Sequence, residues 1–130
     1  MERKLKALVV DDEPSVGDAL RLILEEAGYE AVVERSGHSG IGRLDEGAFD
    51  VLITDLRLPD MSGIDLLRRA AQKERASRMI MITAFSITAA VRDEALALGA
   101  MAVLAKPFSP STVLDLVTRP SPARRAEREA

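Results

Sequence analysis

Cysteine and tryptophan are both absent from this chain of 130 residues, and aromatic residues of any kind are few. Without cysteine there is no disulfide framework, no thiolate metal site and no cysteine nucleophile. Because the chain has only three Phe and one Tyr, its core must be aliphatic, and a hydrophobic fraction of 47% is ample for one. A chain of this length is expected to form one domain.

Long apolar runs and an excess of positive charge are absent too. No apolar run approaches the ~18 residues of a membrane span, and the amino terminus carries no signal-peptide pattern. We therefore expect a cytoplasmic chain that makes no membrane contact. The net charge of -3 provides no large basic surface, so direct binding of nucleic acid is not expected.

What the chain does contain is a fivefold alternation of strand and helix patterns. Apolar runs at 5–10, 51–54, 79–82 and 102–105, with a more polar run at 29–34, predict the strands. Apolar residues at helical spacing predict helices after Pro14 and over 39–46, 64–71 and 87–98, and a last short helix that Ser109 caps and Pro110 opens. His38, the only histidine, is expected on a solvated loop before the second helix. This alternation favours right-handed crossovers and a mainly parallel α/β sheet.

Four of the five strand patterns end in polar residues that could do chemistry. Asp11 and Asp12 follow the first strand, Asp55 the third, Thr83 the fourth and Lys106 the fifth. The carboxyl ends of parallel strands lie along one edge of a sheet, which is where such folds place their sites. The sequence therefore predicts a cluster of three carboxylates, one hydroxyl and one ammonium.

This cluster needs a counterion. At ~4 Å and an effective dielectric constant of about 20, each pair of carboxylates costs roughly 4 kcal/mol, and one lysine offsets only part of that. An all-oxygen site suits Mg2+ or Mn2+. With the cation present, one carboxylate can act as a nucleophile toward phosphorus, while the ammonium and the hydroxyl are suited to phosphoryl oxygens. The alternative, ordinary polar residues at strand ends, explains any one of these residues but not the ordered set.

The motifs resemble those of a known family. Asp11-Asp12, Asp55 followed by Leu-Pro and Met-Ser-Gly, Thr83-Ala84 and Lys106-Pro107-Phe108 are similar to the receiver domain of two-component response regulators, the CheY-like family. The resemblance covers about residues 5–118. It implies a flavodoxin-like, doubly wound α/β fold of five strand–helix units, with a five-stranded parallel sheet in the order 2-1-3-4-5. We accordingly assign residues 1–118 to a receiver domain and residues 119–130 to a tail or linker stub.

The resemblance also implies a role for each polar residue. Asp55 would be the phosphoacceptor, and Thr83 and Lys106 would each bind a phosphoryl oxygen. The peptide bond between Lys106 and Pro107 is expected to be cis. Four groups would hold Mg2+, or Mn2+ in its place: the carboxylates of Asp11, Asp12 and Asp55 and the backbone carbonyl of Arg57.

The implied function is a signalling switch rather than an enzyme that acts on other molecules. A sensor histidine kinase, a phosphotransfer protein or a small phosphodonor would supply the phosphoryl group, and the domain would catalyse only its own phosphorylation and dephosphorylation. The face formed by the fourth helix, fifth strand and fifth helix would then change toward a downstream effector domain or protein. The chain is expected to be either a stand-alone receiver or the N-terminal receiver of a longer regulator.

Three positions depart from the family's commonest pattern. Val103 stands where an aromatic residue usually swings inward on activation, which predicts a shallow switch. Arg57 and Phe85 occupy the two positions that flank the phosphoryl group and tune its hydrolysis in the family.

Three other functions remain as alternatives. A phosphate-independent pseudo-receiver is disfavoured by the intact set of Asp, Thr and Lys residues. A Mg2+-dependent aspartyl-phosphate phosphatase typically has a second acid where Arg57 stands. A flavodoxin-type cofactor carrier needs a hydroxyl- and Gly-rich loop after the first strand, where this chain has three acids.

Overall fold

The computed structural model describes residues 4–120. The strands and helices alternate along the chain as predicted: β1 (Leu5–Val10), α1 (Pro14–Glu26), β2 (Tyr29–Glu34), α2 (Gly37–Glu46), β3 (Phe49–Asp55), α3 (Gly63–Lys73), β4 (Ala76–Thr83), α4 (Ala89–Ala97), β5 (Ala100–Ala105) and α5 (Pro110–Thr118). Most of the predicted tail, residues 121–130, lies outside the described residues.

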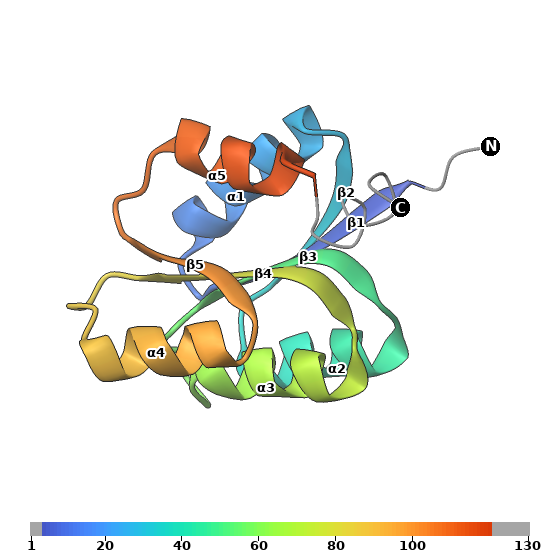
Figure 1. The fold of residues 1–130 in the computed structure, drawn as a ribbon. Coiled ribbons are helices and arrows are strands. Elements are labelled where there is room, and N and C mark those ends of the chain that lie inside the picture. The colour runs from blue at the N-terminus through green and yellow to red at the C-terminus, as the bar shows by residue number, and fades with distance from the viewer. Residues whose placement is uncertain (1–3, 121–130) are drawn as a thin grey trace, which may run out of the picture.

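The sheet has five parallel strands in the order β2-β1-β3-β4-β5, which confirms the predicted fold (Figure 1). The strands β1 and β3 are neighbours, and Val10 is in register with Thr54. The residues that follow them, Asp11 and Asp55, therefore emerge side by side at the carboxyl edge. The edge strands are β2, which was predicted as an edge, and β5.

Helices cover both faces of the sheet (Figure 1). The pair α1 and α5 packs on one face, and α2, α3 and α4 pack on the other. Each interface is an aliphatic core, with Leu20, Leu24 and Val113 in the first and Leu44 and Leu66 in the second. All five side chains are fully buried, and complete burial of an aliphatic side chain contributes about 1.5–3 kcal/mol. The sheet that carries the polar strand ends is thus packed against an aliphatic core on both faces.

Two side chains hold the carboxyl end of α5 against the sheet. The Tyr29 hydroxyl donates a hydrogen bond to the Val117 carbonyl at 2.7 Å, and Arg78 Nη1 donates one to the Leu116 carbonyl at 2.8 Å. The last carbonyls of a helix have no partner within the helix, so these donors satisfy groups that would otherwise need water. Since Tyr29 and Arg78 lie near the starts of β2 and β4, this anchor is at the edge opposite Asp55.

Some predicted details of the helices were wrong. The helix α2 begins at Gly37 rather than at residue 39, because the Ser36 hydroxyl caps it by accepting a hydrogen bond from the Ser39 amide. His38 therefore lies in a helical turn and not in a loop, although it is solvent-exposed as expected. Ser109 occupies the N-cap position of α5, but its hydroxyl contacts Ser111 and makes no capping bond.

Within residues 4–120, no helix is long and apolar enough to cross a membrane.

Candidate functional site

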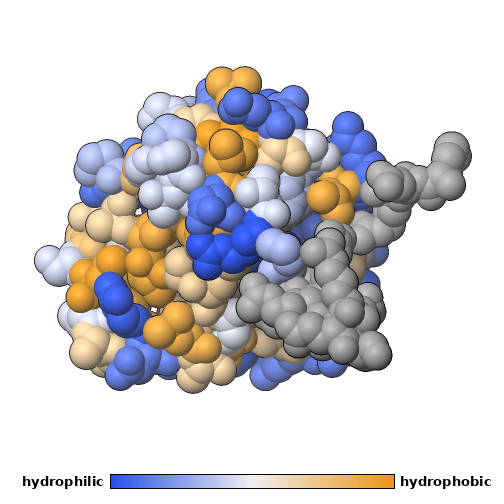
Figure 2. Space-filling model, turned by 45° about the horizontal axis from the view of Figure 1, so that its top comes forward, coloured by the Kyte–Doolittle hydropathy of each residue, from blue (hydrophilic) through white to orange (hydrophobic). Residues whose placement is uncertain are grey.

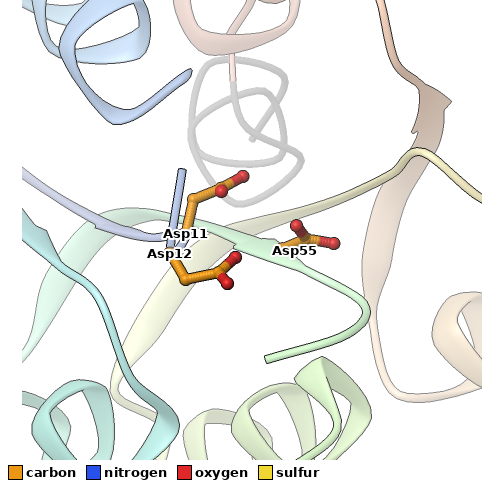
Figure 3. A group of neighbouring side chains, drawn as sticks. All are labelled: Asp11, Asp12 and Asp55. Atoms are coloured by element: carbon orange, nitrogen blue, oxygen red, sulfur yellow. The ribbon is translucent and has the colours of Figure 1, made fainter. Parts of the chain in front are cut away.

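Three carboxylates meet at the carboxyl edge of the sheet (Figure 3). Asp11 and Asp12 follow β1, Asp55 is the last residue of β3, and one oxygen from each lies within 4.8 Å of the others. Asp11 and Asp55 are buried, while Asp12 is exposed. The predicted clustering of acids is therefore found, and Asp12 leaves the cluster open to solvent on one side.

Lys106 is the counterion of this cluster. Its Nζ lies 2.8 Å from Asp55 Oδ2, 2.9 Å from Asp11 Oδ2 and 3.0 Å from Glu13 Oε1. Burial alone would lower the pKa of the Lys106 ammonium, but the hydrogen bonds and charges of these carboxylates outweigh burial and hold that pKa above its usual value. The peptide bond to Pro107 is cis, as predicted. The contact between Lys106 and Glu13 was not predicted, although Glu13 directly follows Asp11 and Asp12 in the sequence and could have been included in the acidic cluster.

Asp11 is the most constrained of the acids. Its Oδ1 accepts a hydrogen bond from the Glu13 amide at 2.9 Å. Its Oδ2 is buried, and its partner is the Lys106 ammonium at 2.9 Å. Burial raises the pKa of the Asp11 carboxyl, and this outweighs the lowering by the Glu13 amide and by Lys106. Carboxylate oxygens are the ligands that a hard cation prefers, so Mg2+ fits the all-oxygen set of Asp11, Asp12 and Asp55.

The raised pKa of Asp11 leads to a prediction that distinguishes it from ordinary surface acids. In metal-free protein, the Asp11 carboxyl is expected to titrate above its ordinary value of 3.8, and Mg2+ should shift the midpoint down. Because this pKa is higher in the folded than in the unfolded chain, folded protein binds the Asp11 proton more tightly. The free energy of unfolding should therefore gain a contribution from Asp11 as the pH falls through the raised pKa toward 3.8, and should lose it as the pH rises again. Carbon-detected NMR titration of the carboxyl groups measures the midpoint.

Asp45 is the internal control for that titration. The ion pairs with Lys73 and Arg69 lower the pKa of its carboxyl, so its stabilising contribution is lost only when the pH falls below the ordinary range. Asp11 and Asp45 titrating together would contradict the desolvation of the Asp11 carboxylate.

The loop after β3 packs tightly behind Asp55. The Arg57 amide donates a hydrogen bond to Asp55 Oδ1 at 3.2 Å, and the Gly63 amide donates one to the Leu56 carbonyl at 2.7 Å. A Cβ atom at Gly63 would lie only 2.1 Å from the Asp55 carbonyl oxygen, so this position requires glycine. The close approach fixes both the Asp55 backbone and the turn that leads away from it. The role of the Arg57 carbonyl as a metal ligand stays a prediction.

Thr83 ends β4 on the neighbouring strand, where Asp55 is in register with Ile82. Its buried hydroxyl accepts a hydrogen bond from the Phe85 amide at 3.0 Å, which leaves the hydroxyl hydrogen as a donor. The Lys106 amide donates to the Thr83 carbonyl at 2.8 Å, so the two residues are tied together through the main chain. This geometry places Thr83 at the same edge as the acids.

Arg57 and Phe85, which depart from the family pattern, lie against one another. The Arg57 guanidinium stacks on the Phe85 ring, 4.0 Å from its centroid, although the ring is 50% exposed. A cation–π contact at an exposed position is worth about 0.5–1 kcal/mol. The stack joins the loops after β3 and β4, and nothing in the sequence spacing pointed to it.

Comparisons with known proteins agree with this geometry. A family model described as the response regulator receiver domain matches residues 7–118. The chain is 31% identical over 105 residues to the transcriptional regulatory protein TrcR of Mycobacterium tuberculosis, an alignment that covers 81% of this chain and 40% of TrcR. It is 34% identical over 125 residues to the response regulator protein PilR of Pseudomonas aeruginosa, covering 95% of this chain and 28% of PilR. The chain thus spans less than half the length of these two relatives.

Solved structures are similar along nearly the whole chain. The crystal structure of a CheY-like response regulator receiver domain protein from Methanospirillum hungatei aligns with a TM-score of 0.84 at 27% identity, covering 98% of this chain and 100% of that one. The chemotaxis response regulator CheY4 of Vibrio cholerae aligns with a TM-score of 0.76 at 29% identity, covering 87% of this chain and 95% of that one.

Proposed function

Because the chain belongs to the family of response regulator receiver domains, we propose that Asp55 is the phosphoacceptor of a phosphorylation-controlled switch. The observation that carries this assignment is the position of the Asp55 carboxylate. It lies 2.8 Å from the Lys106 ammonium and within 4.8 Å of carboxylate oxygens of Asp11 and Asp12. The Asp55 carboxylate thus has a cationic partner on one side and, in this proposal, metal ligands beside it.

The chemistry follows from the residues at this edge. An Asp55 oxygen attacks the phosphorus, the bond between phosphorus and the donor atom breaks, and the departing group takes the electron pair. Asp11, Asp12 and Asp55, with the Arg57 carbonyl, would hold Mg2+ or Mn2+, which neutralises charge on the phosphoryl oxygens when it is bound. Lys106 would exchange its contact with Asp55 for one phosphoryl oxygen, and the Thr83 hydroxyl would donate to another.

The donor is proposed to be a sensor histidine kinase, a phosphotransfer protein or a small acyl phosphate. In support, a hollow of about 430 Å³ lies beside Lys106, between α1 and the loop after β5. Val16, Ala19, Pro107 and Phe108 are among its lining residues, so the entrance to the site is bordered by apolar side chains. Figure 2 shows apolar surface gathering on the side of the loops that follow β4 and β5, at the left of the view. A protein donor could bury such a surface.

The output surface is proposed to be the face formed by α4, β5 and α5. Leu96 on α4 is 45% exposed, and β5 is an edge strand. Val103 on β5 is half-buried and packs against the core beneath α4. Since valine has no ring to swing inward, we propose a shallow switch carried by the backbone after Thr83 and by α4. An effector domain or protein would respond to it, without contact of this domain with nucleic acid or membrane, in the cytoplasm.

The alternatives are less well supported. Arg57 stacks on Phe85 at the position where an aspartyl-phosphate phosphatase typically has its second acid. A phosphate-independent pseudo-receiver would not require an ion pair between Asp55 and Lys106, but this chain has one, with 2.8 Å between Asp55 Oδ2 and Lys106 Nζ.

Incubation with acetyl phosphate tests the proposed function. With Mg2+ present, the chain is expected to gain one phosphoryl group, because the nucleophile, the ligands and the ammonium belong to the domain itself. Intact-mass spectrometry detects the addition, which should be labile to base as an acyl phosphate is. EDTA provides the control and should prevent the reaction. A chain that binds Mg2+ but gains no phosphoryl group from acetyl phosphate would count against the proposal.

A further inference from the structure

The side chain of Asp60, in the loop after β3, contacts the first residues of helix α2. Asp60 Oδ1 accepts a hydrogen bond from the Gly37 amide at 2.8 Å, and Oδ2 accepts one from the His38 amide at 2.9 Å. The first amides of a helix have no partner within the helix, and its dipole favours an anion there. These amides hold the pKa of the Asp60 carboxyl below its usual value. Asp60 therefore anchors the loop to the amino end of α2.

Close packing reinforces this anchor. A Cβ atom at Gly37 would lie only 2.1 Å from Met61 Cγ, so the Met61 side chain occupies the space that any larger residue at position 37 would need. The tip of the loop is thus seated on α2 by two charged hydrogen bonds and by a van der Waals contact.

The loop itself is a tight hairpin that links this tip to the site. Arg57 and Ser62 form an antiparallel bridge, and the Leu58 amide donates a hydrogen bond to the Met61 carbonyl at 3.1 Å. At the base of the hairpin, the Arg57 amide donates to Asp55 Oδ1. Consecutive hydrogen bonds therefore connect the tip of the hairpin to the main chain beside Asp55.

We propose that Asp60 is a positioning residue for the cation and phosphoryl site: it holds the hairpin on α2 and thereby fixes the main chain at Arg57 beside Asp55. This inference rests on the proposed function, in which the backbone carbonyl of Arg57 is a metal ligand. Loss of a group that orients a metal ligand typically weakens metal binding 10–100-fold, and Asp60 acts through a further hairpin turn, so we expect about 3–10-fold for its loss.

Titration with Mg2+ alone, followed by the NMR shifts of the Asp12 and Asp55 amides, tests this role. Asp60→Ala should bind Mg2+ about 3–10-fold more weakly than the unchanged chain. Asp65→Ala is the matched control, because it removes the same charge from an exposed residue that contacts Arg68 and not α2. Solvent screening should keep the control within about twofold of the unchanged chain. Asp60→Asn, which keeps one acceptor oxygen, should fall between them.

Two further measurements test the contact between the hairpin and α2, while the Mg2+ affinity of folded Asp60→Ala separates positioning from simple stabilisation of α2. Gly37→Ala keeps the aspartate at position 60, but its Cβ would lie 2.1 Å from Met61 Cγ, so it should displace Met61 and weaken Mg2+ binding as well. In metal-free Asp60→Ala, the Gly37 and His38 amides should exchange their hydrogens faster, since they lose their acceptors. Thermal unfolding verifies that each variant is folded.

The outcomes distinguish the two proposals. A folded Asp60→Ala that binds Mg2+ as well as Asp65→Ala would overturn the role of Asp60 while leaving the proposed function intact. If the unchanged chain neither binds Mg2+ nor gains a phosphoryl group, both proposals are overturned.

Discussion

Replacing Asp55 by asparagine is expected to abolish phosphorylation by acetyl phosphate. The amide is not a nucleophile toward phosphorus, and a site without its nucleophile offers no route to the acyl phosphate. The change is nearly isosteric, so the turn closed by the Arg57 amide on Oδ1 should persist and the variant should fold. Intact-mass spectrometry of Asp55→Asn with Mg2+ and acetyl phosphate should therefore detect no added phosphoryl group.

Asp65→Asn is the matched control for this experiment. It makes the same chemical change in the first turn of α3, where the carboxylate is exposed and pairs with Arg68. This variant should be phosphorylated like the unchanged chain. A phosphoryl group that survives in Asp55→Asn and maps to another residue would show that Asp55 is the wrong acceptor.

Replacing Lys106 by methionine is expected to have the largest effect on stability. The Lys106 side chain is 9% exposed and faces three carboxylates, two of them buried. Removing one partner from a buried ion pair leaves an uncompensated charge and typically costs about 3–5 kcal/mol. Because the pKa of Lys106 lies above its ordinary 10.5, its stabilising contribution is fully present below pH 10.5 and is lost as the pH rises through the folded value.

Urea unfolding in the presence of EDTA measures this loss, with Lys73→Met as the control. Lys73 also pairs with a carboxylate, that of Asp45 at 2.9 Å, but both side chains are largely exposed. Solvent screens exposed ion pairs, so the control should be nearly neutral. Equal losses in the two variants would mean that Lys106 is not the counterion of a buried cluster.

The same Lys106 variant should be phosphorylated much more slowly. Loss of a preorganised group that stabilises developing charge typically lowers a rate about 10²–10³-fold. The initial rate with acetyl phosphate at saturating Mg2+ measures this effect, because saturation removes any change in metal affinity. An unchanged rate would argue against contact between Lys106 and the phosphoryl group.

Most of the fold could be predicted from the sequence because its signals are local. Each of these signals lies within a short segment of the sequence. They are the apolar runs, Pro14 at the start of α1, and Gly28 and Gly99, which have positive φ angles after α1 and α4. The meeting of Asp11, Asp55 and Lys106 could also be predicted. It depends on where the strands end, and parallel strands end at a common edge.

The remaining features depend on contacts between segments that are far apart in the sequence. That Asp60 accepts hydrogen bonds from the first amides of α2, and that Phe85 lies under the Arg57 guanidinium, follows from how the loops fold back on the sheet. Neither contact leaves a periodicity or a spacing in the sequence. The start of α2 was placed two residues late for a related reason. Gly37, Gly40 and Gly42 lower the helix propensity of this segment, and the cap at Ser36 and the seat of Met61 on Gly37 compensate for it.

The contact between Tyr29 and the end of α5 gives the molecule an optical reporter. The chain has one tyrosine and no tryptophan, so its intrinsic fluorescence arises at this single buried phenol. The hydroxyl is bonded to Val117, at the edge of the sheet opposite Asp55. A change in tyrosine emission on phosphorylation would therefore report a change in the surroundings of Tyr29 at the carboxyl end of α5, with no label attached.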